Sequence, residues 1–353
     1  MNLVDTELLG DPIFQLNIVL WLAQPLPAGS PIIPIFYQSG FSIYAVAPLL
    51  GLSPDLRLDC QRANFEIQDR SRPDVVLVHK NANKYAIAEC KKSSFGPGSS
   101  TAHQARTLLL ISGPRAYEVL GVNRSQVAAV LLCYFAPDTA KKALTGTLGD
   151  LRQEIVDLGL PAGECSVIGM KIADEHLGIS VDDAASALFE LHAGFHPFLS
   201  LDPGTDPRPL YFIPFDPDVE QSPNEKLLCK RILFERIHGA ILSAVGRANA
   251  PVTLLIQPSE ILNDAMFGMS RHWENQAALR HMRRLCRQFI EGLATCLNAV
   301  TPETLAYRQP EGWRLTVTDV AHHEALMNRL TRFSSEELDL RTDPKPGLFD
   351  DFE

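Results

Sequence analysis

The sequence predicts an α/β domain with a central mixed sheet flanked by helices, followed by a mainly helical C-terminal domain. Three short segments rich in β-branched and aromatic residues, at 63–68, 74–79 and 85–91, are separated by turn residues and are typical of strands. The continuous apolar run at 127–135 fits a buried central strand. Apolar periodicity at 223–247 and 271–298 indicates the long helices of the second domain.

The other elements follow in chain order from the same signals. Apolar runs predict a buried helix at 13–23 and, after a Pro-rich connector at 24–34, a second helix at 41–51. A serine/threonine cap followed by an apolar run predicts a helix over 99–112. We expect a further helix at 138–159, a strand at 165–173, a strand pair at 305–309 and 313–319, and a helix at 320–333.

A Pro/Gly-rich stretch at 195–210 interrupts every periodic pattern and indicates a domain boundary. The predicted organisation is an N-terminal helix and connector at 1–34, an α/β domain at 35–195, a mainly helical domain at 210–340 and a tail at 341–353.

Composition restricts the function and the compartment. The chain has 353 residues and a formal net charge of -10, which argues against a protein coated in basic surface but is compatible with a local basic cleft. The seven cysteines show no C-x-x-C or zinc-finger spacing and are typical of thiols in a reducing compartment. The apolar run at 13–23 follows acidic residues and is too short to cross a bilayer, so we expect a cytoplasmic protein without membrane contact.

The stretch PDVVLVHKNANKYAIAECKK, which starts at Pro73, predicts a hairpin that gathers charge at one end. If residues 80–83 form a four-residue loop, Asp74 comes opposite Glu89, and directly opposed residues point to the same face. Lys91 lies two residues beyond Glu89 and shares its face, whereas Cys90 points to the other face and packs. Two adjacent carboxylates and an amine are therefore expected together.

Such a cluster has a chemical explanation. Two close carboxylates repel each other, and a divalent cation with oxygen ligands, Mg²⁺ or Mn²⁺, relieves the conflict. A lysine beside the metal can orient or deprotonate a water and stabilise developing negative charge, which phosphodiester hydrolysis requires. For Glu89-Cys90-Lys91 taken alone, the competing interpretation is a solvated strand edge.

At these residues the sequence resembles the PD-(D/E)XK nuclease superfamily over roughly residues 35–175. Pro73-Asp74 matches the PD element, and Glu89-Cys90-Lys91 matches (D/E)XK. The resemblance implies a restriction-endonuclease-like core in which Asp74 and Glu89 bind the metal and Lys91 assists the attacking water.

Two further positions of the family pattern remain to be assigned. The family often adds an acid from a helix before the core; the predicted helix at 41–51 has none, and Glu66 is a weak substitute. For the polar residue that often follows on the next helix, Gln104 is the candidate, with His103 and Arg106 as alternates. The competing interpretation of Gln104 is an amide on the helix surface. His79 is interpreted as a residue at the end of a strand and not as a metal ligand.

The C-terminal domain offers a basic stripe at helical spacing, with Trp273 earlier on the same predicted helix. Such a stripe could follow a phosphate backbone, although a solvated helix face is the competing interpretation. The stripe consists of Arg280, Arg283, Arg284 and Arg287.

These observations predict a magnesium-dependent nuclease acting on DNA in bacterial restriction, anti-phage defence or repair. The sequence has no G-K-[ST] loop, so any ATPase or helicase function would come from a partner protein. A homodimer is the other form of association that we consider. The alternative is a catalytically inactive nuclease-like protein that binds nucleic acid or a partner subunit. The missing helix acid and the acidic net charge favour that alternative.

Overall fold

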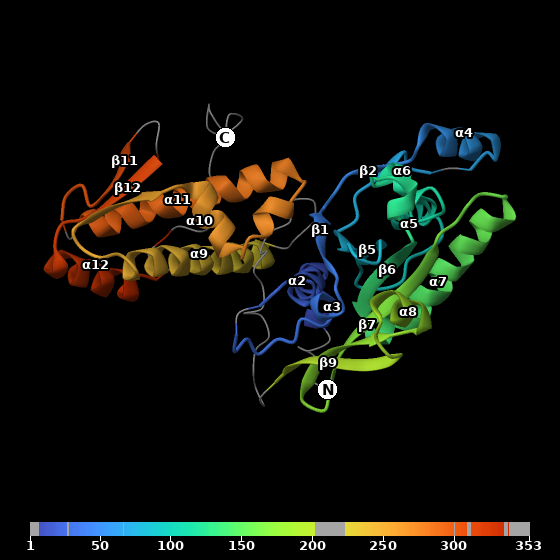
Figure 1. Cartoon of the computed structure of the whole chain (residues 1–353), viewed down its shortest axis with the longest axis horizontal. Coiled ribbons are helices and arrows are strands. Elements are labelled where there is room, and N and C mark those ends of the chain that lie inside the picture. Colours follow the sequence, from blue (N-terminus) through green and yellow to red (C-terminus); the bar gives the residue numbers. More distant parts are fainter. Residues whose placement is uncertain are drawn as a thin grey trace. The chain divides into compact units, whose positions relative to one another are not determined.

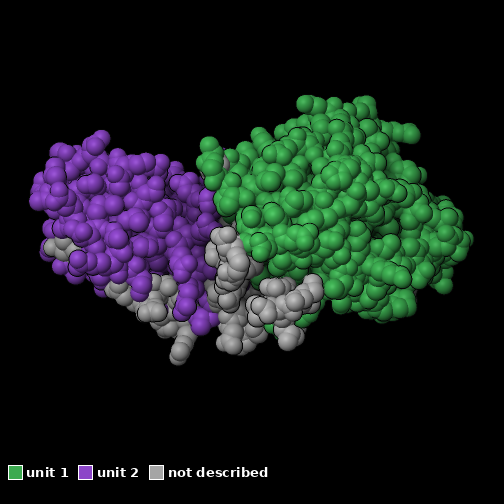
Figure 2. All heavy atoms as spheres, turned by 90° about the horizontal axis from the view of Figure 1, so that it is seen from below, with its two compact units in different colours: residues 1–210 green, residues 211–353 purple. Residues whose placement is uncertain are grey.

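The computed structural model describes residues 7–26, 28–65, 67–201, 223–299, 301–308, 312–334 and 338. Glu66, the predicted tail at 341–353 and the second half of the predicted boundary stretch lie outside the described residues. The chain divides into two compact units, the first unit at residues 1–210 and the second unit at residues 211–353 (Figure 2).

A seven-stranded mixed sheet is the centre of the described part of the first unit, in the order β1-β4-β5-β6-β7-β8-β9 (Figure 1). Strands β5, β6 and β7 are parallel, and the remaining neighbours pair antiparallel. The mixed α/β character predicted from the sequence is confirmed. The strands are β1 (Ser42–Val46), β4 (Val75–His79), β5 (Lys84–Cys90), β6 (Ala129–Pro137), β7 (Glu164–Ala173), β8 (His176–Val181) and β9 (Gly194–Ser200), and β2 (Leu50–Gly51) pairs with β3 (Arg70–Ser71) apart from them.

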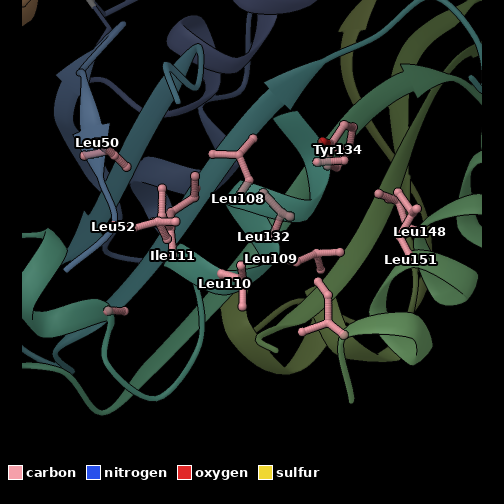
Figure 3. Close-up of a cluster of buried hydrophobic side chains, with 14 of the residues drawn as sticks. Leu50, Leu52, Leu108, Leu109, Leu110, Ile111, Leu132, Tyr134, Leu148 and Leu151 are labelled. Atoms are coloured by element: carbon pink, nitrogen blue, oxygen red, sulfur yellow. The ribbon is translucent and has the colours of Figure 1, made fainter. Parts of the chain in front are cut away.

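Helices cover both faces of this sheet. Helices α2 (Pro12–Leu22) and α8 (Asp183–Phe189) contact its central strands, and α5 (Ser100–Ile111) packs with α7 (Asp138–Asp157). Leucines of α5 and α7 form a buried cluster with Leu132 and Tyr134 of β6 (Figure 3). The shorter helical segments are α3 (Ile35–Gln38), α4 (Pro54–Arg62), α6 (Ala116–Val119) and η1 (Arg124–Gln126).

Two sequence predictions before the hairpin are wrong. The segment 41–51 is not a helix, because it forms β1 and β2, and β1 pairs antiparallel with β4. The segment 63–68 is not a strand in its described residues; Phe65 and Ile67 are partly buried against the core without pairing. Short apolar runs cannot be divided between helix and buried strand by periodicity alone, which explains the first error.

The sheet also extends further than the sequence predicted. Strands β8 and β9 continue it to Ser200, and α8 lies between them in the chain. The N-terminal helix α2, which the sequence analysis set apart in residues 1–34, contacts β5 and β6 within the first unit.

The described part of the second unit combines helices with a three-stranded antiparallel sheet in the order β10-β12-β11. The long helices and the strand pair predicted there are present, whereas β10 and α10 were not anticipated. The elements are α9 (Pro223–Gly246), β10 (Val252–Ile256), α10 (Pro258–Ala265), η3 (Met269–His272), α11 (Gln276–Asn298), β11 (Leu305–Arg308), β12 (Gly312–Val317) and α12 (Val320–Arg332). Across the described residues of both units, no helix has the length and apolar character needed to span a bilayer.

Candidate active site

The β4–β5 hairpin has the register expected from the sequence. His79 pairs with Lys84 around the turn, and the last ladder pair at the open end is Val75 with Ala88. Asp74 and Glu89 each lie one residue beyond that pair. Because side chains alternate along a strand, Glu89 shares a face with Ile87, which packs in the cluster beneath α5.

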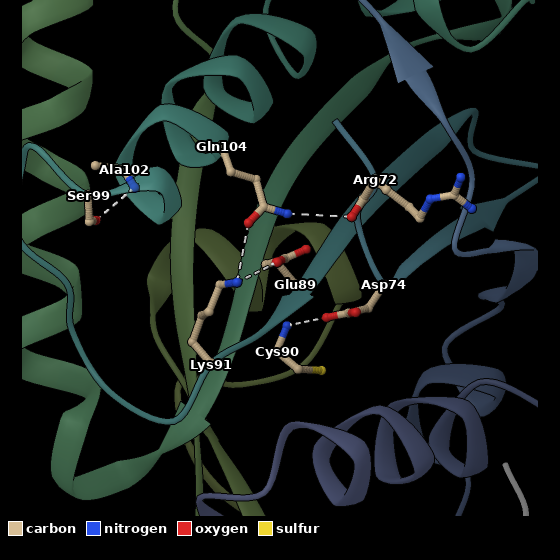
Figure 4. A network of polar contacts seen from close by, with 8 residues as sticks. All are labelled: Arg72, Asp74, Glu89, Cys90, Lys91, Ser99, Ala102 and Gln104. Carbon is tan, nitrogen blue, oxygen red and sulfur yellow. Dashed lines mark hydrogen bonds and ion pairs between the residues drawn. The ribbon is translucent and has the colours of Figure 1, made fainter. Parts of the chain in front are cut away.

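Three side chains form a continuous polar contact at this end of β5 (Figure 4). The Nζ atom of Lys91 lies 2.8 Å from Oε1 of Glu89 and donates to Oε1 of Gln104 at 3.3 Å. Gln104, from the second turn of α5, donates its Nε2 to the carbonyl oxygen of Arg72 at 3.5 Å. The lysine is thus held between a strand and a helix, and its ammonium group is oriented by both.

Asp74 joins the same end of the hairpin by a different contact. Its Oδ2 accepts a hydrogen bond from the backbone N–H of Cys90 at 2.6 Å, which ties the start of β4 to the end of β5. The Cys90 side chain points away from Glu89 (Figure 4) and is buried. The structure therefore brings Asp74, Glu89, Lys91 and Gln104 to one place.

Burial dominates the electrostatics of the site. Burial raises the pKa of Glu89, whose side chain is 4% exposed, and the charge of Lys91 only partly opposes this. For Lys91, burial lowers the pKa, but the ion pair and hydrogen bond with Glu89 and the charge of Asp74 outweigh it, so the pKa lies above its ordinary value. Lys91 is therefore a cation near neutral pH.

Two buried oxygen atoms next to this pair have no hydrogen-bond partner in the described structure. They are Oε2 of Glu89 and the hydroxyl of Tyr134, which stands beside Glu89 in the parallel ladder between β5 and β6. Buried polar atoms are normally satisfied, and here the Asp74 backbone and the Gln104 side chain lie close enough to the Glu89 carboxyl to lower its pKa without forming a hydrogen bond of normal geometry to Oε2. Carboxylate oxygens such as those of Glu89 and Asp74 are the kind of ligand that a hard divalent cation prefers.

The number of acidic ligands limits which cation fits. Within the described ranges no cluster of three or more His, Cys, Asp and Glu side chains is formed. If a cation binds at this end of the hairpin, Asp74 and Glu89 are the carboxylates that could hold it, and water would have to complete its shell. Mg²⁺ suits such a site because it retains several waters and takes one or two carboxylates.

Sequence reasoning missed Gln15 and Tyr134. Gln15, on α2, donates its Nε2 to the carbonyl oxygen of Lys91 at 3.1 Å and to that of Leu9 at 2.7 Å. The Oε1 of Gln15 is buried and has no hydrogen-bond partner among the described residues. The signal for Gln15 was an amide inside an otherwise apolar helix. Tyr134 lies within an apolar strand and could not be distinguished from a core residue.

The other sequence candidates lie outside the cluster. Arg106 binds Glu154 at 2.8 Å and the carbonyl oxygen of Pro97 at 2.9 Å, so it braces α5. His103 lines a separate hollow. His79 lies at the opposite end of the hairpin, where its ring accepts the N–H of Ala82 and packs against Phe41.

The basic stripe is divided in the second unit. Arg283 and Arg287 line one hollow with Tyr307 and Trp313, and Arg280 and Arg284 are not among its lining residues. The expectation that Trp273 lies on the same helix is wrong, because α11 begins at Gln276 and Trp273 is buried, 3% exposed, ahead of it.

Comparison with known proteins found no match among protein-family models, curated proteins or solved structures. Arguments about function therefore depend on the chain's own residues.

Proposed function

We propose that the chain is a metal-dependent nuclease that hydrolyses phosphodiester bonds in DNA. The observation that carries the proposal is the meeting of Asp74, Glu89, Lys91 and Gln104 at one hairpin end, with Oε2 of Glu89 buried and unsatisfied. A restriction-endonuclease-like core belongs to the same proposal. A mixed sheet whose central strands contact α2, with a buried α5–α7 cluster, supports it.

Each residue then has a distinct role. Asp74 and Glu89 would hold Mg²⁺ or Mn²⁺, which supplies an acidified water and neutralises charge on the phosphate when bound. Lys91, protonated and fixed by Glu89 and Gln104, would orient the attacking water and stabilise the negative charge that develops on the phosphoryl oxygens. Gln104 is a positioning residue, since it acts through the Lys91 ammonium group.

The biological setting extends the proposal. A role in bacterial restriction, anti-phage defence or repair, a cytoplasmic location, and a partner ATPase or helicase are consistent with this chemistry and are proposed with it. The chain's net charge of -10 requires that any contact with DNA be made through local cations.

A cleavage assay on supercoiled and linear DNA tests the proposal, with Mg²⁺, Mn²⁺ or EDTA. We expect Lys91→Ala to lower the cleavage rate by about 100-fold or more, because it removes the positioned proton donor and cation. Lys92→Ala is the matched control, since Lys92 is the next residue and is exposed. Cleavage by Lys91→Ala at the wild-type rate would falsify the mechanism.

A non-catalytic, nuclease-like protein that binds nucleic acid or a partner subunit is the second candidate. It is favoured by the presence of only two acidic side chains at the described site. Calorimetric titration with Mn²⁺ separates the two proposals. Metal binding that is lost in Asp74→Asn, together with metal-dependent cleavage, supports the enzyme; DNA binding without metal binding or cleavage supports the second candidate.

A further inference from the structure

A hollow of about 740 Å³ in the second unit is lined by residues of α11, the start of α10 and one end of the β10-β12-β11 sheet. Its walls differ in chemistry. The helix wall presents Arg283, Arg287 and Glu291, and the sheet wall presents the rings of Tyr307 and Trp313. The helix wall thus carries two cations and one anion, and the sheet wall carries two aromatic side chains.

The strand register explains why the rings are available. Trp313 of β12 stands opposite both Ile256 of β10 and Tyr307 of β11. In the next row, Leu315 and Leu305 are 1% and 2% exposed, whereas Tyr307 is 49% exposed. The covered face of the sheet therefore opens to solvent at the Trp313 row. The two rings are 5.4 Å apart and tilted by 58°, so their faces are not stacked on each other.

The arginines concentrate positive charge opposite these rings. Arg283 and Arg287 are four residues apart on α11, which places them on one side of the helix. Burial lowers the pKa of Arg283, and the neighbouring Arg287 charge adds to this. The start of α10 is also on the wall; its N-cap residue Gln257 makes no side-chain capping bond, and a helix N-terminus favours anions.

An unpaired nucleotide has an exposed base, which the aromatic side chains could bind, and a phosphate, which the arginines could bind. We propose that this hollow binds a nucleotide of a single-stranded nucleic acid, with its base against Trp313 and Tyr307 and its phosphates at Arg283 and Arg287. Aromatic stacking combined with a cationic groove is the general means of holding single strands without sequence preference. In a duplex the base faces are already stacked and cannot reach these rings. The identity of the ligand as nucleic acid rests on the proposed nuclease function.

Fluorescence anisotropy tests this on the full chain, in EDTA so that no cleavage occurs. The probes are a labelled 12-nucleotide single strand, the same sequence as a duplex, and free dAMP as a competitor. We expect tighter binding of the single strand. Tyr307→Ala and Trp313→Leu should each weaken it by about 10-fold or more, because stacking on one aromatic side chain stabilises a base by ~1–3 kcal/mol.

Charge variants supply an independent readout. Arg283→Gln and Arg287→Gln should each weaken binding and reduce the salt slope by about 0.7, because each removes one phosphate contact. Arg332→Gln, which changes an exposed arginine on α12, is the matched control and should bind like the wild type. Tyr307 is half exposed, so its variant is expected to fold even if the Trp313 variant does not.

Several outcomes would overturn the inference: equal affinity for the duplex, unchanged binding by Tyr307→Ala, or full displacement of the strand by micromolar dAMP, which would indicate a site for free nucleotides. Lys91→Ala separates this inference from the nuclease proposal. If the wild-type protein does not cleave DNA under any condition, and Tyr307→Ala still weakens strand binding, only the nuclease proposal fails. If cleavage depends on Lys91 but strand binding ignores Tyr307, only the present inference fails.

Discussion

Glu89 is the residue on which the candidate site depends most. One of its oxygens is tied to Lys91, and the other is buried without a partner in the described structure. Burial raises its pKa, so the native surroundings favour the neutral carboxyl more than water does. A buried carboxyl with a raised pKa stabilises the fold poorly, and strongly perturbed groups of this kind cluster at functional positions.

A stability measurement at Glu89 tests this conflict. The raised pKa means that ionised Glu89 destabilises the native state at pH 7 and that this penalty disappears below about pH 4.5, where the carboxyl is protonated in both states. We therefore expect Glu89→Gln to unfold at the same or higher urea concentration than the wild type at pH 7, and the difference to vanish in acid.

Lys91→Ala is the contrasting variant, because it leaves the buried carboxylate without its cation. We expect it to lower the free energy of unfolding by about 2 kcal/mol at pH 7. If Glu89→Gln is the more damaging of the two, the ion pair stabilises the fold outright and the site is structural.

Asp74, Glu89 and Lys91 were predictable because the hairpin is local, whereas Gln104, on α5, was suggested only by the family pattern. A four-residue turn determines the pairing, and the pairing determines which side chains meet at the open end. Gln15 was not predictable in the same way, since α2 is far from β5 in the chain and its contact with the Lys91 carbonyl depends on tertiary packing. The divided arginine stripe has the same cause: helical spacing places side chains on one side of α11 but does not say what faces each of them.

At the scale of elements, the sequence predicted strands β4 to β7 and helices α2, α5 and α7, but it missed β8, β9 and α8 and assigned the first strand, β1, to a helix. Segment 41–51 is short and mostly apolar, and the alternation of buried and exposed side chains in β1 covers only Ser42 to Ala45, so periodicity did not distinguish a strand from a helix. Helix α2 is buried at every position from Ile13 to Leu22, which removes the polar face by which a covering helix is usually oriented. Segment 41–51 is fixed as a strand only by the long-range pairing of β1 with β4.

Arg106 supplies the prediction at this scale, because it connects α5 to α7 and to the loop after β5. Its side chain is 10% exposed and contacts both Glu154 and the Pro97 carbonyl. Arg106→Met keeps the aliphatic stem but loses these charge-assisted bonds, so we expect unfolding free energy to fall by about 2 kcal/mol in urea titration. Glu154→Gln, at a side chain 43% exposed, should cost less than about 1 kcal/mol. Equal losses would mean that the ion pair, and not the Pro97 contact, holds α5.

At the scale of the whole molecule, the chain has two compact units, and its cysteines are spread over both. None of the seven is disulfide-bonded, and five of them are buried. The partly buried thiols are Cys165 in the first unit and Cys296 in the second.

Thiol titration with DTNB examines both units at once. Burial raises the pKa of Cys165 to about 11, so on the order of one Cys165 thiol in a thousand is ionised at pH 8. We expect Cys296 to react first, Cys165 slowly, and the five buried thiols only after denaturant is added. Rapid reaction of Cys60, Cys90 or Cys133 in the native protein would contradict the packing described for the first unit.

The connector before β1 contacts the last strand of the large sheet. The Ile33 N–H donates to the Phe198 carbonyl oxygen at 2.8 Å, and Ile32 forms an isolated bridge with Leu199. Because β9 lies at the edge of the sheet, its outer backbone groups would otherwise be a template for strands of other molecules. Ile32 and Ile33 thus cover part of the outer edge of β9. A shortened chain that began after Pro34, as the sequence boundaries suggest, would lose this cover together with α2, and its molecules would associate edge to edge.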